Sequence, residues 1–230
     1  MNLKINNKEL IKGLSIICLY LFLGAILSTP FIFLYQKNII SEELANILLY
    51  LSLTIVFILI YIKDIIKDFK NFKKDYKYIL KTTFNYWLKG LFIMLAFSIF
   101  ISFINIAPNT NQEANIALFK EMPIVEILCA VIFAPLIEEL VFRRGLKKFT
   151  NNKHLYAITT GLIFGLLHIL SSISSPSDYI MFLYLIPYSS VGITFGYAYY
   201  KTDNIYGSII IHAMHNAISL IELAIIGGLL

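Results

Sequence analysis

The sequence predicts an all-α fold, a polytopic membrane helical bundle of seven to eight transmembrane helices. Of its 230 residues, 58% are apolar and only 14% are charged, and the mean hydropathy is +0.75. A soluble domain is usually about half apolar and about a quarter charged. So much apolar surface cannot be hidden inside one soluble core of this size, so the expected solvent is the lipid bilayer.

Seven apolar runs are each long enough to cross a bilayer, which takes roughly 20 helical residues. In chain order they are 13–35, 44–62, 84–107, 122–142, 155–173, 179–200 and 205–226. An eighth span results if the last run divides in two. The first run is too long for a signal peptide and is soon followed by another span, so we expect it to be retained.

Basic residues favour every second loop. They cluster before the first run, between 63 and 81, and again between 143 and 153, whereas the alternate loops hold only Lys37 and Lys120. Because loops rich in Lys and Arg stay in the cytoplasm, we expect an inside N-terminus in a bacterial cytoplasmic membrane. The charge of +5 then indicates membrane lipids as partners, and no nucleic acid. The 63–81 segment is expected to be a solvated loop helix near anionic headgroups.

The chain changes character about halfway. We interpret 1–230 as a single membrane domain, in which 1–120 supplies three N-terminal spans and 121–230 supplies catalytic core helices. The first three spans hold no acid or histidine at depth, whereas the later runs contain several polar groups. Polar groups at membrane depth are costly and usually functional, so the chemistry is expected in 121–230.

Two adjacent carboxylates end the fourth run. Glu139 and Arg143 are four residues apart, so they share a helix face and can pair. Glu138 lies about 100° further round and lacks that partner. We expect Glu138 to lie in the drier place of the two, which suits a general base for water. The alternative is two interfacial glutamates anchored by arginines.

The fifth run places a histidine on a stripe of glycines. Gly161, Gly165 and His168 follow an i, i+4, i+7 spacing, and small residues let another helix approach closely. Gly192 and Gly196 repeat the spacing in the sixth run, where simple packing is expected. His168 is thereby brought against a neighbouring helix, either for catalysis or as an ordinary interhelical hydrogen-bond partner.

The last run carries a histidine and an asparagine on one face. His212 and Asn216 are four residues apart, an arrangement suited to donating two hydrogen bonds to one developing oxyanion. His215 lies about 60° from that face and is expected to be structural or supporting. Glu222 is a possible partner for His215, and the roles of both stay open.

Three ordered motifs on three separate spans resemble those of the CPBP family of intramembrane proteases, over residues 121–222. They are Glu138-Glu139-x-x-x-Arg143, Phe164-x-x-x-His168 and His212-x-x-x-Asn216. That family includes CAAX prenyl endopeptidases and bacterial Abi proteins linked to bacteriocin processing and immunity. Arg144 is a small departure, because many members have glycine directly after the motif arginine.

The resemblance implies a role for each matching residue in an intramembrane endopeptidase. Glu138 would activate the attacking water with help from His168. His212 and Asn216 would stabilise the oxyanion. Glu139 and Arg143 would orient the site, and Phe164 would shape the pocket by packing. Peptides or membrane-tethered proteins are the expected substrates, for example a leader peptide, a lipoprotein or a regulator.

Several alternatives remain beside this hypothesis. Glu138, His168 and His212 could make a zinc site with one open position, although the resemblance favours a glutamate-dependent mechanism with no cofactor. A non-catalytic bacteriocin-immunity or binding protein has no need of Glu138. A transporter with a proton relay would leave the pairing of His212 with Asn216 unexplained.

Overall fold

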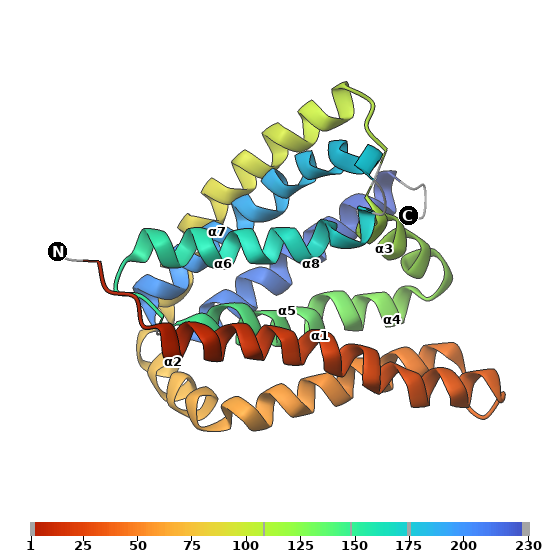
Figure 1. The fold of residues 1–230 in the computed structure, drawn as a ribbon, viewed down its shortest axis with the longest axis horizontal. Helices are drawn as coiled ribbons and strands as arrows, with labels where there is room; N and C mark the ends of the chain where they lie inside the picture. Colours follow the sequence, from red (N-terminus) through yellow and green to blue (C-terminus); the bar gives the residue numbers. More distant parts are fainter. Residues whose placement is uncertain (1–2, 108, 148, 174–175, 227–230) are drawn as a thin grey trace.

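The computed structural model describes residues 3–107, 109–147, 149–173 and 176–226, and within them every named element is a helix (Figure 1). This confirms the all-α prediction for the described part of the chain. The elements are α1 Asn7–Gln36, α2 Glu42–Phe103, α3 Thr110–Glu121, α4 Pro123–Ile127, η1 Leu128–Phe133, α5 Ala134–Glu138, η2 Glu139–Arg144, α6 Lys153–Ile169, η3 Leu170–Ser172, η4 Pro176–Tyr184, α7 Leu185–Thr202 and α8 Ile205–Ile226. Elements η1 and η2 are π-helical, and η3 and η4 are 3-10 helices.

Five of the described helices are long and apolar enough to cross a membrane, so the predicted number of seven to eight is not confirmed. They are Asn7–Gln36, Glu42–Phe103, Lys153–Ser172, Asp178–Thr202 and Ile205–Ile225. The difference from the prediction arises in two places, because two predicted spans share α2 and the predicted span 122–142 is divided among short elements.

Helix α2 contains the predicted spans 44–62 and 84–107 together with the loop between them. Its 62 residues correspond to about 93 Å at 1.5 Å per residue, roughly three times the hydrocarbon core of a bilayer. Helical geometry is broken at Asp75, with φ −121° and ψ 20°. Figure 1 shows α2 turning back there, so that its second arm rises beside α7. The predicted helix over 63–81 is therefore present, as the middle part of α2 that contains the kink at Asp75.

The predicted span 122–142 is divided into α4, η1, α5 and η2. In a π-helix each N–H bonds to the carbonyl five residues before it, as Ala134 does to Cys129. The same pattern would pair the Ala130 carbonyl with Pro135, which has no N–H. The Ala130 carbonyl is thus left for another donor, close to the two glutamates in sequence.

Helix α3 was not predicted, because its segment is polar and lies between two apolar runs. Asn109 precedes it, and its side-chain oxygen accepts a hydrogen bond of 3.0 Å from the backbone N–H of Gln112. An Asn followed three residues later by Gln is a helix-start signal related to the capping box. That signal was present in the sequence and could have identified this helix.

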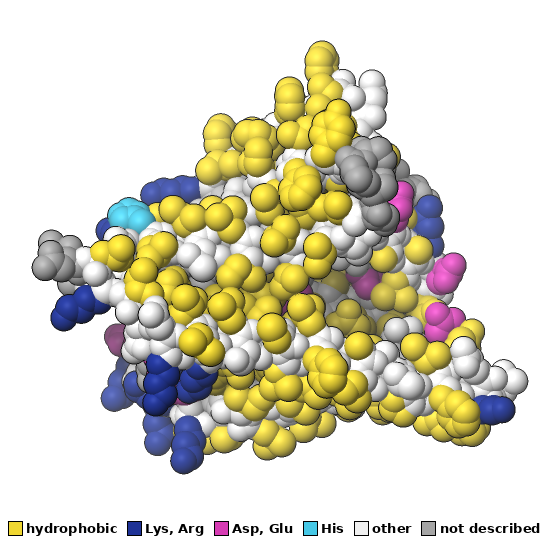
Figure 2. Space-filling view, in the orientation of Figure 1, with side chains coloured by type: hydrophobic (Ala, Val, Ile, Leu, Met, Phe, Trp, Pro, Cys, Tyr) yellow, Lys and Arg dark blue, Asp and Glu magenta, His cyan; other side chains and the backbone are white. Residues whose placement is uncertain are grey.

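The surface fits a lipid environment. Figure 2 shows hydrophobic side chains over most of the visible face, with Lys and Arg gathered mainly at one end. The turn of α2 and the start of α6 lie at that same end (Figure 1). Large apolar side chains such as Phe92 and Phe103 are exposed. Soluble monomers rarely expose apolar patches as extensive as the one that these side chains belong to. Together with the five long apolar helices, they fit a membrane protein.

Helix α7 packs closely on α6 through glycine, as the spacing predicted. A Cβ atom built on Gly161 would lie 2.4 Å from the backbone nitrogen of Ile193, and one on Gly196 would lie 2.8 Å from the Cα of Ala157. The other side of α7 meets the second arm of α2, where a Cβ on Gly90 would lie 2.9 Å from the Ser190 carbonyl oxygen. Helix α7 is therefore fixed between α6 and α2.

Substituting Gly161→Ala is expected to destabilise the protein by about 1–3 kcal/mol, because the added methyl group overpacks the contact of α6 with α7. Gly24→Ala is a matched control, because nothing lies within 4 Å of the position that its Cβ would take, and there the better helix propensity of alanine should stabilise by up to about 1 kcal/mol. Thermal unfolding in detergent measures both. Equal melting temperatures for the two variants would contradict the close approach.

Candidate active site

Glu139 and Arg143 form a completely buried ion pair. Arg143 Nε lies 3.4 Å from Glu139 Oε2, and both side chains have 0% exposure. The predicted i, i+4 pairing is therefore confirmed. Arg143 also places its guanidinium carbon 5.1 Å from the centre of the Phe164 ring, a cation–π contact. The Tyr156 hydroxyl donates to the Arg143 carbonyl at 2.7 Å, which fixes the backbone of η2 against α6.

His212 lies between the two adjacent glutamates. Its Nδ1 is 2.9 Å from Glu139 Oε1, and its Nε2 is 3.7 Å from Glu138 Oε2. A carboxylate accepts hydrogen bonds, so Nδ1 is the donor to Glu139 and Nε2 is directed to Glu138. This arrangement was not foreseen, because the sequence shows only that His212 shares a face with Asn216.

The two glutamates differ in burial in the opposite sense to the prediction. The Glu138 side chain is 13% exposed, whereas that of Glu139 is 0% exposed. The expectation that Glu138 occupies the drier place is therefore wrong. The dry position belongs to Glu139, which can be buried because Arg143 and His212 both face it. Glu138 retains the access that a residue acting on water needs.

His168 is held by the end of its own helix. Its Nδ1 lies 2.8 Å from the Phe164 carbonyl oxygen, which can only accept, so Nδ1 donates and Nε2 is left for another partner. The ring is stacked on Tyr188, with centroids 4.9 Å apart. Among the described residues, no hydrogen bond or ion pair joins His168 to Glu138.

Phe164 connects His168 to the other motif residues. Its ring centroid is 4.2 Å from that of His168 and 5.8 Å from that of His212, and Arg143 lies over its face. The predicted packing role of Phe164 is thus confirmed. The structure brings all three motifs together. His168 is connected to the other motif residues through the Phe164 ring.

Asn216 supplies the hydrogen-bond donor that Pro135 lacks. Its Nδ2 donates to the Ala130 carbonyl at 2.7 Å, the carbonyl whose π-helical partner would be proline. An amide group carries two N–H bonds, so one remains after this contact. His212 likewise uses one ring nitrogen on Glu139. The predicted donor pair thus retains the second N–H of Asn216 Nδ2 and the Nε2 atom of His212.

His215 and Glu222 do not join this group. The His215 ring meets the edge of Trp87 at a centroid distance of 6.4 Å, a packing contact between α8 and the second arm of α2. Glu222 is exposed, and no ion pair between it and His215 occurs among the described residues. The structure therefore places His215 against Trp87, and its supporting role stays a prediction.

The zinc alternative requires three donor side chains close together. Within the described ranges, no three His, Cys, Asp or Glu side chains lie close enough together to hold a metal ion. Glu138, His168 and His212 therefore do not form a ligand set in this arrangement.

A second polar network, missed from the sequence, holds η2 against α2 and α7. Arg144 Nη2 lies 2.9 Å from Asp64 Oδ1 and 3.4 Å from Asp68 Oδ1. Arg144 Nη1 donates a hydrogen bond of 2.8 Å to the Tyr199 hydroxyl. Asp68 is 1% exposed, so the expectation of a solvated 63–81 helix is wrong at this position. Arg144, noted as a departure from the family pattern, thus has a structural partner on each side.

Asp68 also fixes the start of α8. Its Oδ2 accepts a hydrogen bond of 3.1 Å from the Ile205 N–H, and its carbonyl accepts one of 2.7 Å from Asn204 Nδ2. Acidic acceptors at a helix N-terminus satisfy backbone donors that have no partner in the helix. Asp68 thus contacts both Arg144, which follows the two glutamates in η2, and the start of α8, which carries His212. These two contacts help to set the position of His212 relative to the glutamates.

Comparisons with known proteins find a family model that matches the part of the chain with all three motifs. Residues 120–218 match the family model described as type II CAAX prenyl endopeptidase Rce1-like. The chain is 29% identical over 163 residues to an uncharacterized protein of Mycoplasma capricolum, covering 66% of this chain and 46% of that protein. It is 28% identical over 180 residues to the UPF0177 protein YvdC of Lactococcus lactis, covering 73% and 65%.

The matched region is thus about half to two thirds of the length of these relatives. No solved structure matches the chain. The family match spans both glutamates and Arg143, as well as His168, His212 and Asn216. The part of the chain that carries the motifs, residues 120–218, therefore resembles the Rce1-like family of CAAX prenyl endopeptidases, which supports the resemblance that the motifs indicated.

Proposed function

We propose that this protein is an intramembrane endopeptidase that hydrolyses peptide bonds at or near the membrane, with Glu138 as the base that activates water. The observation that carries the proposal is the position of His212 between a buried Glu139 and a partly exposed Glu138. Its occurrence within residues that match a peptidase family adds support. A histidine oriented by one carboxylate and directed at another has a clear use in hydrolysis.

In the proposed reaction, Glu138 takes a proton from water as the water oxygen attacks the carbonyl carbon of the peptide. The free N–H of Asn216 and the Nε2 side of His212 donate to the oxygen that becomes negative, with His212 acting as an imidazolium. Glu138 then returns the proton to the leaving amine as the carbon–nitrogen bond breaks. His168 Nε2 accepts a hydrogen bond from the water and helps to place it.

Glu139 and Arg143 act through His212 in this proposal. Arg143 balances the charge of Glu139, which in turn holds the His212 ring by Nδ1. A preorganised donor costs no reorganisation when charge develops. The pair is therefore a positioning device, and neither residue needs to touch the substrate.

The cellular setting is part of the proposal. We infer a bacterial cytoplasmic membrane with the N-terminus inside, because basic residues favour the loops on one side. The substrate is a peptide or a membrane-tethered protein, and membrane lipids are the other partners. We propose a mechanism without a metal cofactor, in which Glu138 itself activates the water.

Cleavage by purified protein in lipid vesicles tests this function. Wild-type protein is incubated with a library of membrane-tethered peptides, with and without a strong zinc chelator, and fragments are identified by mass spectrometry. We expect cleavage that the chelator does not change. Loss of cleavage that zinc restores would replace the metal-free mechanism by a zinc peptidase. A wild-type protein that cuts no peptide would favour a binding or immunity protein.

A further inference from the structure

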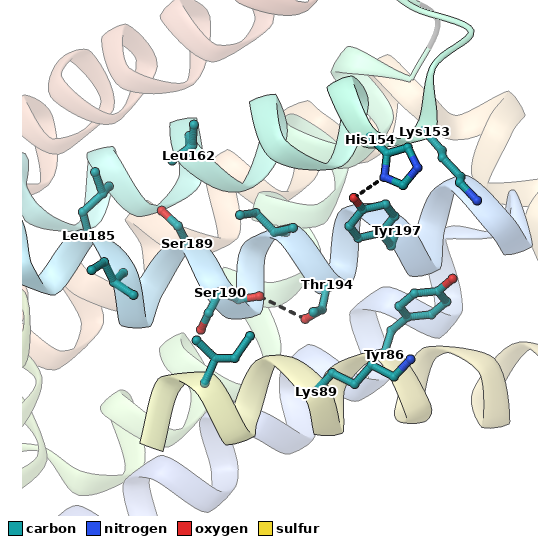
Figure 3. A pocket seen from close by; sticks show the side chains of 13 residues that line it. Tyr86, Lys89, Lys153, His154, Leu162, Leu185, Ser189, Ser190, Thr194 and Tyr197 are labelled. Atoms are coloured by element: carbon teal, nitrogen blue, oxygen red, sulfur yellow. Dashed lines mark hydrogen bonds between the residues drawn. The ribbon is translucent and has the colours of Figure 1, made fainter. Parts of the chain in front are cut away.

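A groove runs along α7, between α6 and the second arm of α2 (Figure 3). Its volume is about 660 Å³. Ser189, Ile193 and Tyr197 line it at helical spacing along α7. Phe195 points to the other side of α7, where its ring packs 5.3 Å from that of His212. The groove is therefore separate from the catalytic residues and lies on the outer side of α7.

The two ends of the groove differ in chemistry. Figure 3 shows Leu162 and Leu185 toward one end, and Lys89 and Lys153 at the other. Among the described lining residues there is no Asp or Glu. Neither lysine forms an ion pair with a carboxylate in the described part of the chain. An apolar channel with an uncompensated cationic end is complementary to an amphipathic anion.

The cationic end is built from ordered aromatic groups. The rings of Tyr86 and Tyr197 are stacked at a centroid distance of 5.9 Å and an angle of 12°. His154 Nδ1 lies 2.7 Å from the Tyr197 hydroxyl, and Lys89 Nζ lies 5.5 Å from the Tyr86 ring. These contacts connect α2, α6 and α7 at one level. Tyrosines gather at the membrane–water interface, which is the level expected for a lipid headgroup.

The groove has the length of one membrane leaflet. From Leu185 to Tyr197 the lining follows α7 over twelve residue-to-residue steps, or about 18 Å at a rise of 1.5 Å for each step. Half of the hydrocarbon core is about 15 Å. Leu162 and Ile186 on its walls are exposed, so it opens sideways to lipid. Its cationic end lies at the basic end of the molecule, where α6 begins (Figures 1 and 2).

We propose that this groove binds one anionic phospholipid from the leaflet on the basic side of the protein. The phosphate lies between Lys89 and Lys153, and one acyl chain lies along Ile193 toward Leu162 and Leu185. Two lysines near an anionic headgroup each contribute about fivefold in affinity. The site is independent of peptide hydrolysis, and it would stabilise the contact of α7 with α2 and α6 on the face opposite His212.

Lipid retention measured by native mass spectrometry tests the site on the full chain. Purified protein is titrated with phosphatidylglycerol or with phosphatidylcholine of the same acyl chains. Wild-type protein should bind the first phosphatidylglycerol in clear preference to phosphatidylcholine. The double variant Lys89→Gln/Lys153→Gln should lose this preference, with a fall of about 25-fold in affinity for phosphatidylglycerol and an unchanged melting temperature.

Two further variants separate a built site from general attraction. Lys63→Gln/Lys67→Gln removes the same charge from exposed positions of α2 outside the groove, and should leave the first binding step unchanged. Leu162→Trp, at an exposed wall position, should lower the affinity for both lipids, because the larger side chain obstructs the acyl chain. The proposal is overturned if the 63/67 pair weakens binding as much as the groove pair, if the two lipids bind equally to wild type, or if Leu162→Trp has no effect.

Discussion

Glu138→Gln will lower kcat for peptide hydrolysis by at least about 100-fold, the usual contribution of a general base. Glutamine keeps the shape of the side chain but cannot accept the proton of water. The loss should be confined to catalysis, because Glu138 is 13% exposed and is not the partner of Arg143. Initial rates with any peptide that wild-type protein cleaves give the comparison, together with the melting temperature of each variant.

Glu126→Gln is the matched control. Glu126 is a buried acid of α4 in the same predicted span, and it has no ion pair with a described residue. Its neutral replacement should leave kcat within a few-fold of wild type. If Glu138→Gln retained more than a tenth of the wild-type rate, or if Glu126→Gln lost as much, Glu138 would not be the base.

Arg143→Met will destabilise the protein by about 3–5 kcal/mol, the cost of leaving one partner of a buried ion pair uncompensated. Methionine retains much of the packing volume against Phe164, but Glu139 then keeps a buried charge that only His212 faces. The double variant Glu139→Gln/Arg143→Met removes that charge and should recover most of the loss. Chemical unfolding in mixed micelles measures each variant.

The exposed change Lys70→Met serves as a control for that series, and it should shift stability by no more than about 0.5 kcal/mol. If the single variant Arg143→Met were as stable as this control, Glu139 and Arg143 would not form the buried ion pair described above. A double variant no better than the single one would show that the loss comes from packing and not from charge.

Spacing along single helices was the part of the site that the sequence could predict. The i, i+4 relation foresaw the pair of Glu139 and Arg143, and the glycine stripe foresaw the approach of α6 to α7. The contact of His212 with both glutamates depends on how α8 is rotated against α5 and η2, which no spacing within one helix reveals. For the same reason the relative burial of Glu138 and Glu139 was predicted in the wrong order.

Backbone irregularity accounts for most of the remaining differences. The acceptor of Asn216 is a carbonyl left free where a π-helix meets Pro135, and hydrophobic periodicity gives no sign of a π turn. The continuity of α2 had a visible signal, because residues 42–89 contain neither proline nor glycine. The burial of Asp68 had none, since its partner Arg144 is distant in sequence.

Single-turnover hydrolysis in water enriched in oxygen-18 tests the central claim most directly, that Glu138 activates a water for direct attack. Wild-type protein in excess over a cleavable peptide is stopped after one turnover, and the isotope content of the new carboxylate is measured by mass spectrometry. The account predicts one labelled oxygen in each new C-terminus, and none in Glu138. Unlabelled product with the label in Glu138 would show that the protein carboxylate attacks first, which would contradict the account.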